Sequence, residues 1–305
     1  MRAASAAETA TTVAPVIVQG AARSPPETVE KQTYSTVQHF TALANPELGQ
    51  IARWRDPVCA QVVGLPQDDQ AALIKARIES VAQDVGLPAA APKCVANVEV
   101  VFSDQPQLTM DIVAKRRDFL LGYFHNHKRT QLKTVSRPIQ SWYVTSTLGQ
   151  GTGSVAMNFS MFSGFSNFRM EEVDDPDLPP PNGCADSRIA ATCLQSRFRN
   201  VFILADTKAL NGKEVGLVAD YMALLALAQP RSLDGCNALA SVMDAFAKTP
   251  CPDRAEPDGL TPADAAYLTA LYEANLRNRK ATEQADIARR MAKILIDANA
   301  PAHAR

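Results

Sequence analysis

Apolar residues recur with two different periods along the first third of the chain. Residues 97–103 place Val98, Val100 and Phe102 on one face, which predicts a strand, and the short apolar run that ends at Val63 predicts another strand before it. Between these strands apolar side chains recur at the spacing of a helix: Leu73, Ile74, Ile78, Val81 and Val85. The order strand, helix, strand predicts a βαβ-like unit, whose crossover is right-handed if the strands are parallel.

The middle of the chain predicts two further strands and a buried helix. Residues 139–145 have the pattern of a strand, and the continuous apolar run 200–205 is typical of a central strand. A helix is predicted from about Lys213 to Gln229, and it is apolar on nearly every side. A helix of this kind must be buried on most of its surface.

The end of the chain is predicted to be helical. Thr261 is a typical N-cap residue, Pro262 suits the first helical position, and Asp264 is an acidic residue in the first turn. We therefore expect a helix that opens here and runs to about Leu276. A second helix is predicted over residues 281–296, with an apolar stripe that includes Ile287 and Met291.

The remaining segments lack these periods and define the domain organisation. Residues 1–30 are rich in Ala and Thr and contain two adjacent prolines, which predicts a disordered leader. Residues 148–196 show no regular pattern, and we expect a surface excursion there rather than a second domain. Residues 299–305 are expected to fray. This leaves one α+β domain over residues 31–298, with a small mixed sheet, a buried central helix and C-terminal helices.

Charge and hydropathy argue against a nucleic-acid-binding protein and against a transmembrane protein. The 31 Lys and Arg residues nearly balance the 32 Asp and Glu residues, whereas proteins that bind nucleic acid through its phosphates usually carry a strong basic excess. The most apolar stretch, Leu217 to Ala228, is interrupted by Asp220 and is too short to span a bilayer. We therefore expect neither nucleic-acid binding nor a transmembrane segment.

The six cysteines indicate an exported protein. They form neighbouring pairs along the chain, and although six cysteines allow fifteen connectivities, we expect local bridges: Cys59–Cys94, Cys184–Cys193 and Cys236–Cys251. No C-x-x-C motif is present, which makes a metal site a weaker interpretation. Six buried thiols in a cytosolic protein are the remaining alternative. Residues 1–30 lack the uninterrupted apolar core of a signal peptide, so we expect a periplasmic or secreted protein whose signal peptide has been removed.

Few residues are candidates for metal chemistry. The chain has four histidines, and His125 and His127 would point to one side of a strand, where they could hold a metal. Lys128 and Arg129 follow directly, and their charge would repel a cation. The acidic run over residues 171–177 lacks the spacing of a calcium-binding EF-hand loop.

Three stretches together resemble a known family. They are residues 219–227, which follow an apolar strand, residues 260–272, which follow a loop that bears a cysteine, and residues 53–57, which precede the first helix. Their layout resembles an uncharacterised group of secreted bacterial proteins that are similar to matrixin-type zincins, which have a metallopeptidase fold. The resemblance covers about residues 45–297, apart from the excursion, and implies a zincin-like core.

In a zincin, the motif H-E-x-x-H on one helix holds the metal and activates water. When the motif is placed on this chain, Ala219 and Ala223 occupy the two histidine positions and Asp220 occupies the glutamate position. A methyl group has no lone pair to offer a cation, so the resemblance implies a degenerate site with no metal and no cofactor. The alternative is a buried core helix of another α/β protein, and in either case Asp220 needs a cleft or a partner.

These observations lead to a functional hypothesis. The chain is expected to be a non-catalytic zincin-like binding protein, a pseudoenzyme of the periplasm or the extracellular space, with an unknown protein or peptide as its ligand. The alternative is an active hydrolase or peptidase that uses acidic residues near Asp220, or a metal held elsewhere by His125 and His127.

Overall fold

The computed structural model describes residues 25–42, 51–122, 129–149, 155–157, 194–252, 254–274 and 280–299. Its strands are β1 (Ala60–Val63), β2 (Val98–Ser103), β3 (Ile139–Gly149), β4 (Val155–Met157) and β5 (Leu194–Asp206). Its helices are α1 (Pro26–Phe40), α2 (Asp68–Asp84), α3 (Pro106–Arg116), α4 (Arg129–Lys133), α5 (Val215–Leu227), α6 (Pro262–Glu273) and α7 (Lys280–Ala298). Short 3₁₀ helices include η1 (Asp118–Leu121) and η4 (Val242–Phe246).

The strands form one mixed sheet in the order β1-β2-β5-β3-β4. The first three are parallel, with Val98 beside Val201, whereas β3 runs antiparallel to β5, with Ile139 beside Ala205. The predicted α+β class, the mixed sheet and the opening parallel unit are confirmed. The central position of β5 agrees with its continuous apolar sequence, because a strand covered on both faces buries every side chain.

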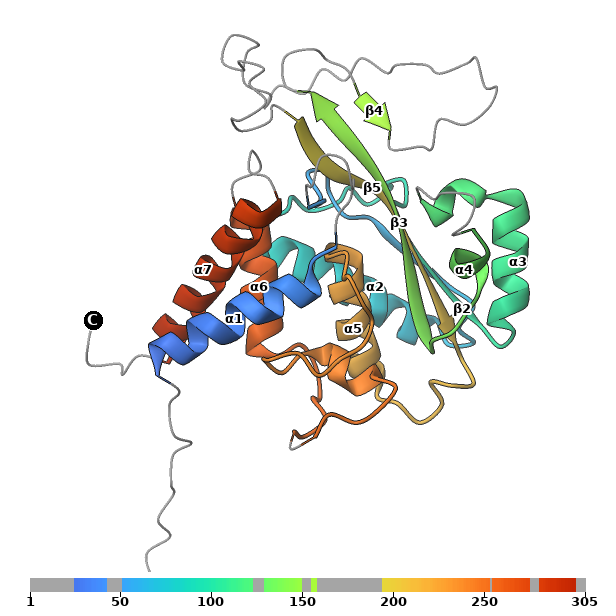
Figure 1. Cartoon of the computed structure of the whole chain (residues 1–305). Helices are drawn as coiled ribbons and strands as arrows, with labels where there is room; N and C mark the ends of the chain where they lie inside the picture. Colours follow the sequence, from blue (N-terminus) through green and yellow to red (C-terminus); the bar gives the residue numbers. More distant parts are fainter. Residues whose placement is uncertain are drawn as a thin grey trace, which may run out of the picture.

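Helices cover both faces of the sheet (Figure 1). On one face, alternate residues of β2 and β5, such as Val100 and Ile203, belong to a large core that also contains side chains of α1, α2, α5, α6 and α7. On the other face, Phe202 and Leu204 pack with Met110 of α3 and Trp142 of β3 in a second, smaller core. The period of two along each strand therefore separates the two cores.

Helix α5 is buried from Leu217 to Leu227 except at Asp220, and its C-terminal end is closed by three aromatic side chains. The last carbonyl groups of a helix have no partner within the helix, and leaving them unpaired inside a protein is costly. Trp54 Nε1 donates to the carbonyl of Ala226 at 2.8 Å, and the hydroxyl groups of Tyr143 and Tyr272 donate to nearby carbonyls of the same turn. This arrangement allows the end of α5 to lie inside the core.

Two predicted boundaries and one predicted core residue were wrong. Helix α1 begins at Pro26, so the leader predicted over residues 1–30 ends inside a helix. Proline is favoured at the first position of a helix, and here it starts one. The excursion predicted over 148–196 includes β4, the end of β3 and the start of β5. Strands β3 and β5 pair beyond the apolar runs 139–145 and 200–205 from which they were predicted, so both strands reach into this segment. Leu73, predicted to lie in the core, is 43% exposed.

Two of the predicted disulfides are confirmed. Cys59 bonds to Cys94, and Cys236 bonds to Cys251, whereas Cys184 and Cys193 lie outside the described residues. The bridges close segments of 35 and 15 residues. Chain entropy alone gives stabilisations of about 4 and about 3 kcal/mol for such loops. Within the described residues, every helix is too short or too polar to cross a membrane.

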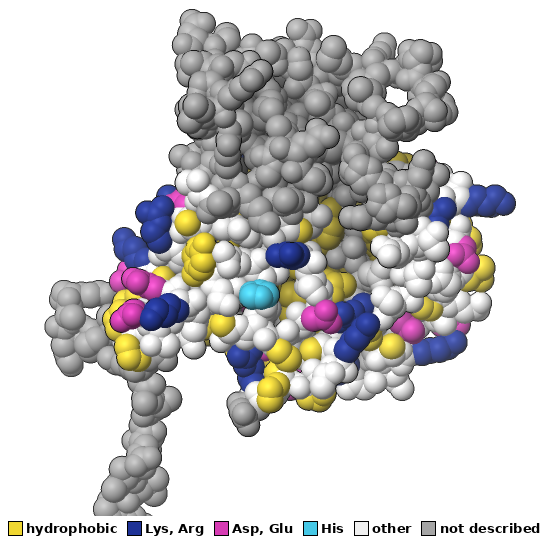
Figure 2. Space-filling model, viewed as in Figure 1, with side chains coloured by type: hydrophobic (Ala, Val, Ile, Leu, Met, Phe, Trp, Pro, Cys, Tyr) yellow, Lys and Arg dark blue, Asp and Glu magenta, His cyan; other side chains and the backbone are white. Residues whose placement is uncertain are grey.

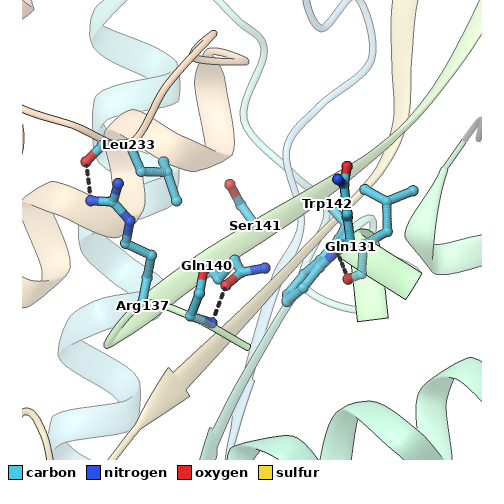
Figure 3. Close-up of a pocket in the computed structure, with 8 residues that line it drawn as sticks. Gln131, Arg137, Gln140, Ser141, Trp142 and Leu233 are labelled. Atoms are coloured by element: carbon cyan, nitrogen blue, oxygen red, sulfur yellow. Dashed lines mark hydrogen bonds between the residues drawn. The ribbon is translucent and has the colours of Figure 1, made fainter. Parts of the chain in front are cut away.

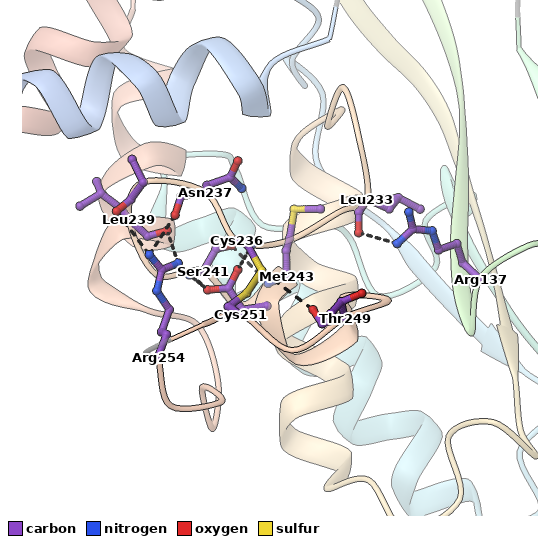
Figure 4. Close-up of a disulfide and its surroundings, with 12 residues drawn as sticks. Arg137, Leu233, Cys236, Asn237, Leu239, Ser241, Met243, Thr249, Cys251 and Arg254 are labelled. Atoms are coloured by element: carbon purple, nitrogen blue, oxygen red, sulfur yellow. Dashed lines mark hydrogen bonds and ion pairs between the residues drawn. A yellow bond between two sulfur atoms is a disulfide. The ribbon is translucent and has the colours of Figure 1, made fainter.

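The Cys236–Cys251 bridge lies in a loop that Arg254 holds together (Figure 4). The guanidinium of Arg254 donates to the carbonyls of Asn237 and Leu239 at 2.9 and 3.2 Å, and to the carboxylate of Asp244 at 2.9 Å. Asp244 also accepts the backbone N–H of Cys236 at 2.7 Å. One cation therefore satisfies several carbonyl groups of a segment that has little regular structure.

Candidate functional site

Ala219, Asp220 and Ala223, which the resemblance aligns with a zincin motif, lie on α5, and two of them belong to the core. Ala219 and Ala223 are completely buried, among the residues that pack between α5 and its neighbours. Neither residue lines either of the two cavities described below. Their methyl groups fill space within the core.

Asp220 is partly exposed, and both of its carboxylate oxygens are engaged. Oδ1 forms an ion pair with Nε of Arg77 on α2, and Oδ2 accepts the backbone N–H of Leu260 at 2.8 Å. A Cβ atom at Gly259 would lie 2.5 Å from Oδ2, so any other residue there would force this carboxylate oxygen to shift. Asp220 thus joins α2, α5 and the segment before α6, and the need for a partner is met by Arg77.

The other candidates for metal binding are not located by the structure. His125, His127 and the acidic run 171–177 lie outside the described residues. Within the described residues, no three His, Cys, Asp or Glu side chains are grouped closely enough to hold a metal ion.

A cavity lies at the carboxyl edge of the parallel strands β2 and β5, and we call it the β2–β5 crevice. Its volume is about 590 Å³. Its lining comes from three segments: residues 105–108 after β2, residues 135–138 before β3, and the end of β5 with the turn after it, which contribute Asp206 and Ala209. Backbone hydrogen bonds join the three segments at this edge of the sheet: Thr207 N donates to Ser103 O at 3.0 Å, and Asp206 N donates to Pro138 O at 2.8 Å.

The crevice coincides with the point where the chain leaves the sheet in two directions. After β2 the chain enters α3 on one face, and after β5 it continues to α5 on the opposite face (Figure 1). Adjacent parallel strands whose connections diverge in this way leave an opening between them. In open α/β sheets ligands bind at this topological switch point.

Two glutamine side chains fix one side of the β2–β5 crevice. The amide of Gln107 donates to the carbonyl of Lys133 at 2.8 Å and accepts the N–H of Val135 at 2.9 Å. The amide of Gln140 accepts the N–H of Ser136 at 3.0 Å and donates to the carbonyl of Thr134 at 3.2 Å. Each side-chain amide accepts one backbone N–H and donates to one backbone carbonyl, as a peptide group of a neighbouring strand would. These bonds hold the loop before β3 in place.

Arg137 connects the crevice to a second, smaller cavity of about 300 Å³ (Figure 3). Its guanidinium donates to the carbonyl of Leu233 at 3.0 Å and forms an ion pair with Asp234. The hydrogen bond from Arg137 lowers the pKa of the Asp234 carboxyl below its usual value. Ser136 and Arg137 line both cavities. Trp142 also lines the smaller one, and its Nε1 donates to the carbonyl of Leu132 at 2.9 Å.

The lining of the β2–β5 crevice is suited to hydrogen bonding. Half of its lining residues are polar, namely Gln105, Gln107, Ser136, Arg137 and Asp206. Asp206 is held in place because its Oδ1 accepts the N–H groups of Lys208 and Ala209 at 2.9 and 3.2 Å. Few precisely placed polar groups in a largely preformed cavity are typical of a ligand site. The sequence patterns did not single out these residues, although polar side chains directly after two apolar strands were a usable signal.

Comparison with known proteins gives no match: no family model, no curated protein and no solved structure is similar to this chain.

Proposed function

We propose that this chain is a periplasmic or secreted binding protein that has no catalytic activity and takes a peptide segment into the β2–β5 crevice. The observation that carries the proposal is the position of the crevice at the switch point of the sheet, with one side fixed by Gln107 and Gln140. Peptide groups carry one donor and one acceptor each, which suits a lining of amide, hydroxyl and carboxylate groups.

The contacts of Asp220 support a role without catalysis. A general base must reach the proton that it removes, and the two oxygens of Asp220 already accept bonds from Arg77 and from the N–H of Leu260. The two disulfides support an oxidising compartment. The balanced charge supports a protein or peptide ligand over nucleic acid. The zincin-like core stays a prediction, supported by the buried helix that follows β5.

The absence of catalysis is tested with the purified full chain. We expect less than stoichiometric zinc by elemental analysis, and no hydrolysis of casein or of a fluorogenic peptide library. The variant Asp220→Asn should behave in the same way as the wild type in both measurements. One zinc per chain, or peptidase activity that Asp220→Asn removes, would show that the alternative hydrolase hypothesis is correct.

The site of binding is tested by filling the β2–β5 crevice. Ala209 is exposed and lines the crevice, so Ala209→Trp should occupy it without disturbing the core. We expect that selection from a random peptide library displayed on phage enriches binders of the wild type, and that Ala209→Trp lowers their affinity by at least about tenfold, equivalent to about 1.4 kcal/mol.

Ala89 provides the matched control, because it is an exposed alanine in the loop before β2, at the opposite edge of the sheet. Ala89→Trp should bind the selected peptides as the wild type does. If no peptide is enriched, or if both tryptophan variants bind equally well, the crevice is not the peptide site.

A further inference from the structure

Asp206, at the end of β5, contributes a carboxylate to the lining of the β2–β5 crevice. The side chain is partly buried, and its two oxygens differ in their contacts. Oδ1 accepts the backbone N–H groups of Lys208 and Ala209, which holds the carboxylate in one orientation. Oδ2 has no hydrogen bond or ion pair within the part of the chain that the structure describes. One carboxylate oxygen is therefore available to a ligand.

Basic side chains near Asp206 are paired with other carboxylates. Arg137, which lines the same crevice, turns its guanidinium toward the loop after α5, where it forms an ion pair with Asp234 (Figure 3). The ammonium group of Lys208 lies 3.9 Å from the carboxylate of Asp104. Both acids lie outside the lining of the crevice. The negative charge of Asp206 is thus left without a counter-ion among the described residues.

The surrounding surface supplies no strong field of either sign. Asp111 and Lys133, which both bond to the amide of Gln107, add one charge of each sign beside the crevice. In Figure 2, Lys and Arg side chains lie among Asp and Glu side chains over the coloured part of the face shown, with no large area of one sign. Selection of a charged ligand therefore depends on contact with Asp206 rather than on long-range attraction.

The contacts of Asp206 favour one kind of cation. A guanidinium group binds a carboxylate best through two parallel N–H···O bonds, which need both oxygens. Oδ1 already accepts two N–H groups, so only Oδ2 is open. An ammonium group is a compact charge that can bond to a single carboxylate oxygen. Its other two donors suit the amide oxygen of Gln105 and the hydroxyl oxygen of Ser136, which belong to the same lining.

We propose that the β2–β5 crevice selects peptides that bring a primary ammonium group to Asp206, either from a free amino end or from a lysine side chain. This inference rests on the function proposed above and adds the chemical class of the ligand. A hydrogen bond between charged groups is stronger than one between neutral groups, and partial burial of Asp206 reduces screening by salt. The ammonium group therefore fixes the register of the peptide in the crevice.

Affinity selection with the purified full chain tests this preference. The probe is a random hexapeptide library made in two halves, one with free and one with acetylated amino ends, and bound peptides are identified by mass spectrometry. We expect peptides with a free amino end or a lysine to be enriched about fivefold to tenfold over acetylated peptides without lysine, as a partly exposed charged hydrogen bond gives. Acetylated peptides whose only cation is arginine should be enriched less. Comparison of lysine-free peptides with free ends and acetylated peptides with lysine shows which ammonium group is used.

Two matched variants assign the preference to one carboxylate. Asp206→Asn should remove it, because the amide oxygen still accepts the N–H groups of Lys208 and Ala209 while the negative charge is lost. Asp104→Asn is the control, since Asp104 is an exposed acid directly after β2 that lies outside the lining, and this variant should keep the preference. Circular dichroism should show that both variants are folded.

Three results would overturn this inference while peptide binding itself is retained. They are equal binding of peptides with and without an ammonium group, equal enrichment of arginine and lysine peptides, and an Asp206→Asn variant that keeps the preference as Asp104→Asn does. Each of them leaves the function proposed above intact. Recovery of no peptide from either half of the library would instead overturn the proposed function, and this inference with it.

Discussion

Replacing Arg53 with alanine is expected to lower the free energy of unfolding by about 3–5 kcal/mol, because it leaves a buried carboxylate without its partner. The side chains of Arg53 and Glu283 are each 2% exposed and form an ion pair. Arg53 also donates to the carbonyl of Ala274 at 3.0 Å, and Glu283 accepts the N–H of Ile51 at 3.1 Å. The pair therefore ties the segment before β1 to α7. Urea unfolding followed by circular dichroism measures the loss.

Arg290, a surface arginine on α7 like the Glu283 partner of Arg53, provides the control for this prediction. Arg290 is 40% exposed and lies beside Asp286 and Glu273, so Arg290→Ala should cost less than about 1 kcal/mol. The double variant Arg53→Met/Glu283→Leu should recover most of the stability that Arg53→Ala loses, because replacing both charges removes the desolvation cost. A loss below about 1 kcal/mol for Arg53→Ala would contradict the burial of this pair.

The same pair predicts a dependence of stability on pH. Burial raises the pKa of Glu283 from 4.5 to about 7, against the attraction of Arg53. The folded protein then holds the proton of Glu283 more tightly than the unfolded chain does. Its contribution to stability is therefore complete below about pH 4.5 and is lost as the pH rises to about 7. The difference in unfolding free energy between wild type and Arg53→Met/Glu283→Leu should decrease across this range.

Asp264→Ala is expected to cost about 3–5 kcal/mol, because each buried donor that loses its acceptor costs about 1–3 kcal/mol. The carboxylate accepts bonds from Ser241 Oγ at 2.6 Å, from Val242 N at 2.7 Å, and from Thr261 N and Oγ1 at 3.0 and 2.9 Å. It joins the first turns of η4 and α6, so its loss unpairs two helix starts. Burial raises the pKa of this carboxyl, against these hydrogen bonds.

Thermal unfolding by calorimetry checks this prediction. Asp258→Ala is the control, because Asp258 is an exposed acid close to the same helix start and its replacement should change stability by less than about 0.5 kcal/mol. Asp264→Asn should fall between the two, since its amide retains one oxygen acceptor but turns an NH₂ group toward donors. Equal stability of Asp264→Ala and Asp258→Ala would show that the donors find other partners.

The sequence predicted those features whose physical cause is local. The period of two in residues 98–102 and the helical period of residues 74–81 gave β2 and α2, because the period shows which side of an element is buried. Thr261 and Asp264 gave the start of α6, where both halves of a capping box are present. The disulfide between Cys236 and Cys251 could be predicted because the two cysteines are only 15 residues apart in the sequence.

The apolar pattern of the sequence identified α5 as a buried helix, but no local pattern shows what surrounds its residues. The need of Asp220 for a partner followed from its apolar neighbours, whereas the identity of that partner, Arg77, depends on the packing of α2 against α5. In the same way, Glu283 gave no signal in the sequence. Its pairing with Arg53 arises because the chain ends of the fold, α1 and α7, pack against the segment before β1.

The sequence by itself determined strands β1, β2, β3 and β5, helices α2, α5, α6 and α7, two local disulfides and the balanced charge of this protein. Only the tertiary structure decided that β2 lies beside β5, and that α3 and α5 leave the sheet on opposite faces. Residues 105–108 and Asp206, far apart in the chain, meet for that reason alone. Side-chain periods record which face of a strand is buried, but the choice of neighbouring strand depends on burial summed over the whole core, which no local pattern contains.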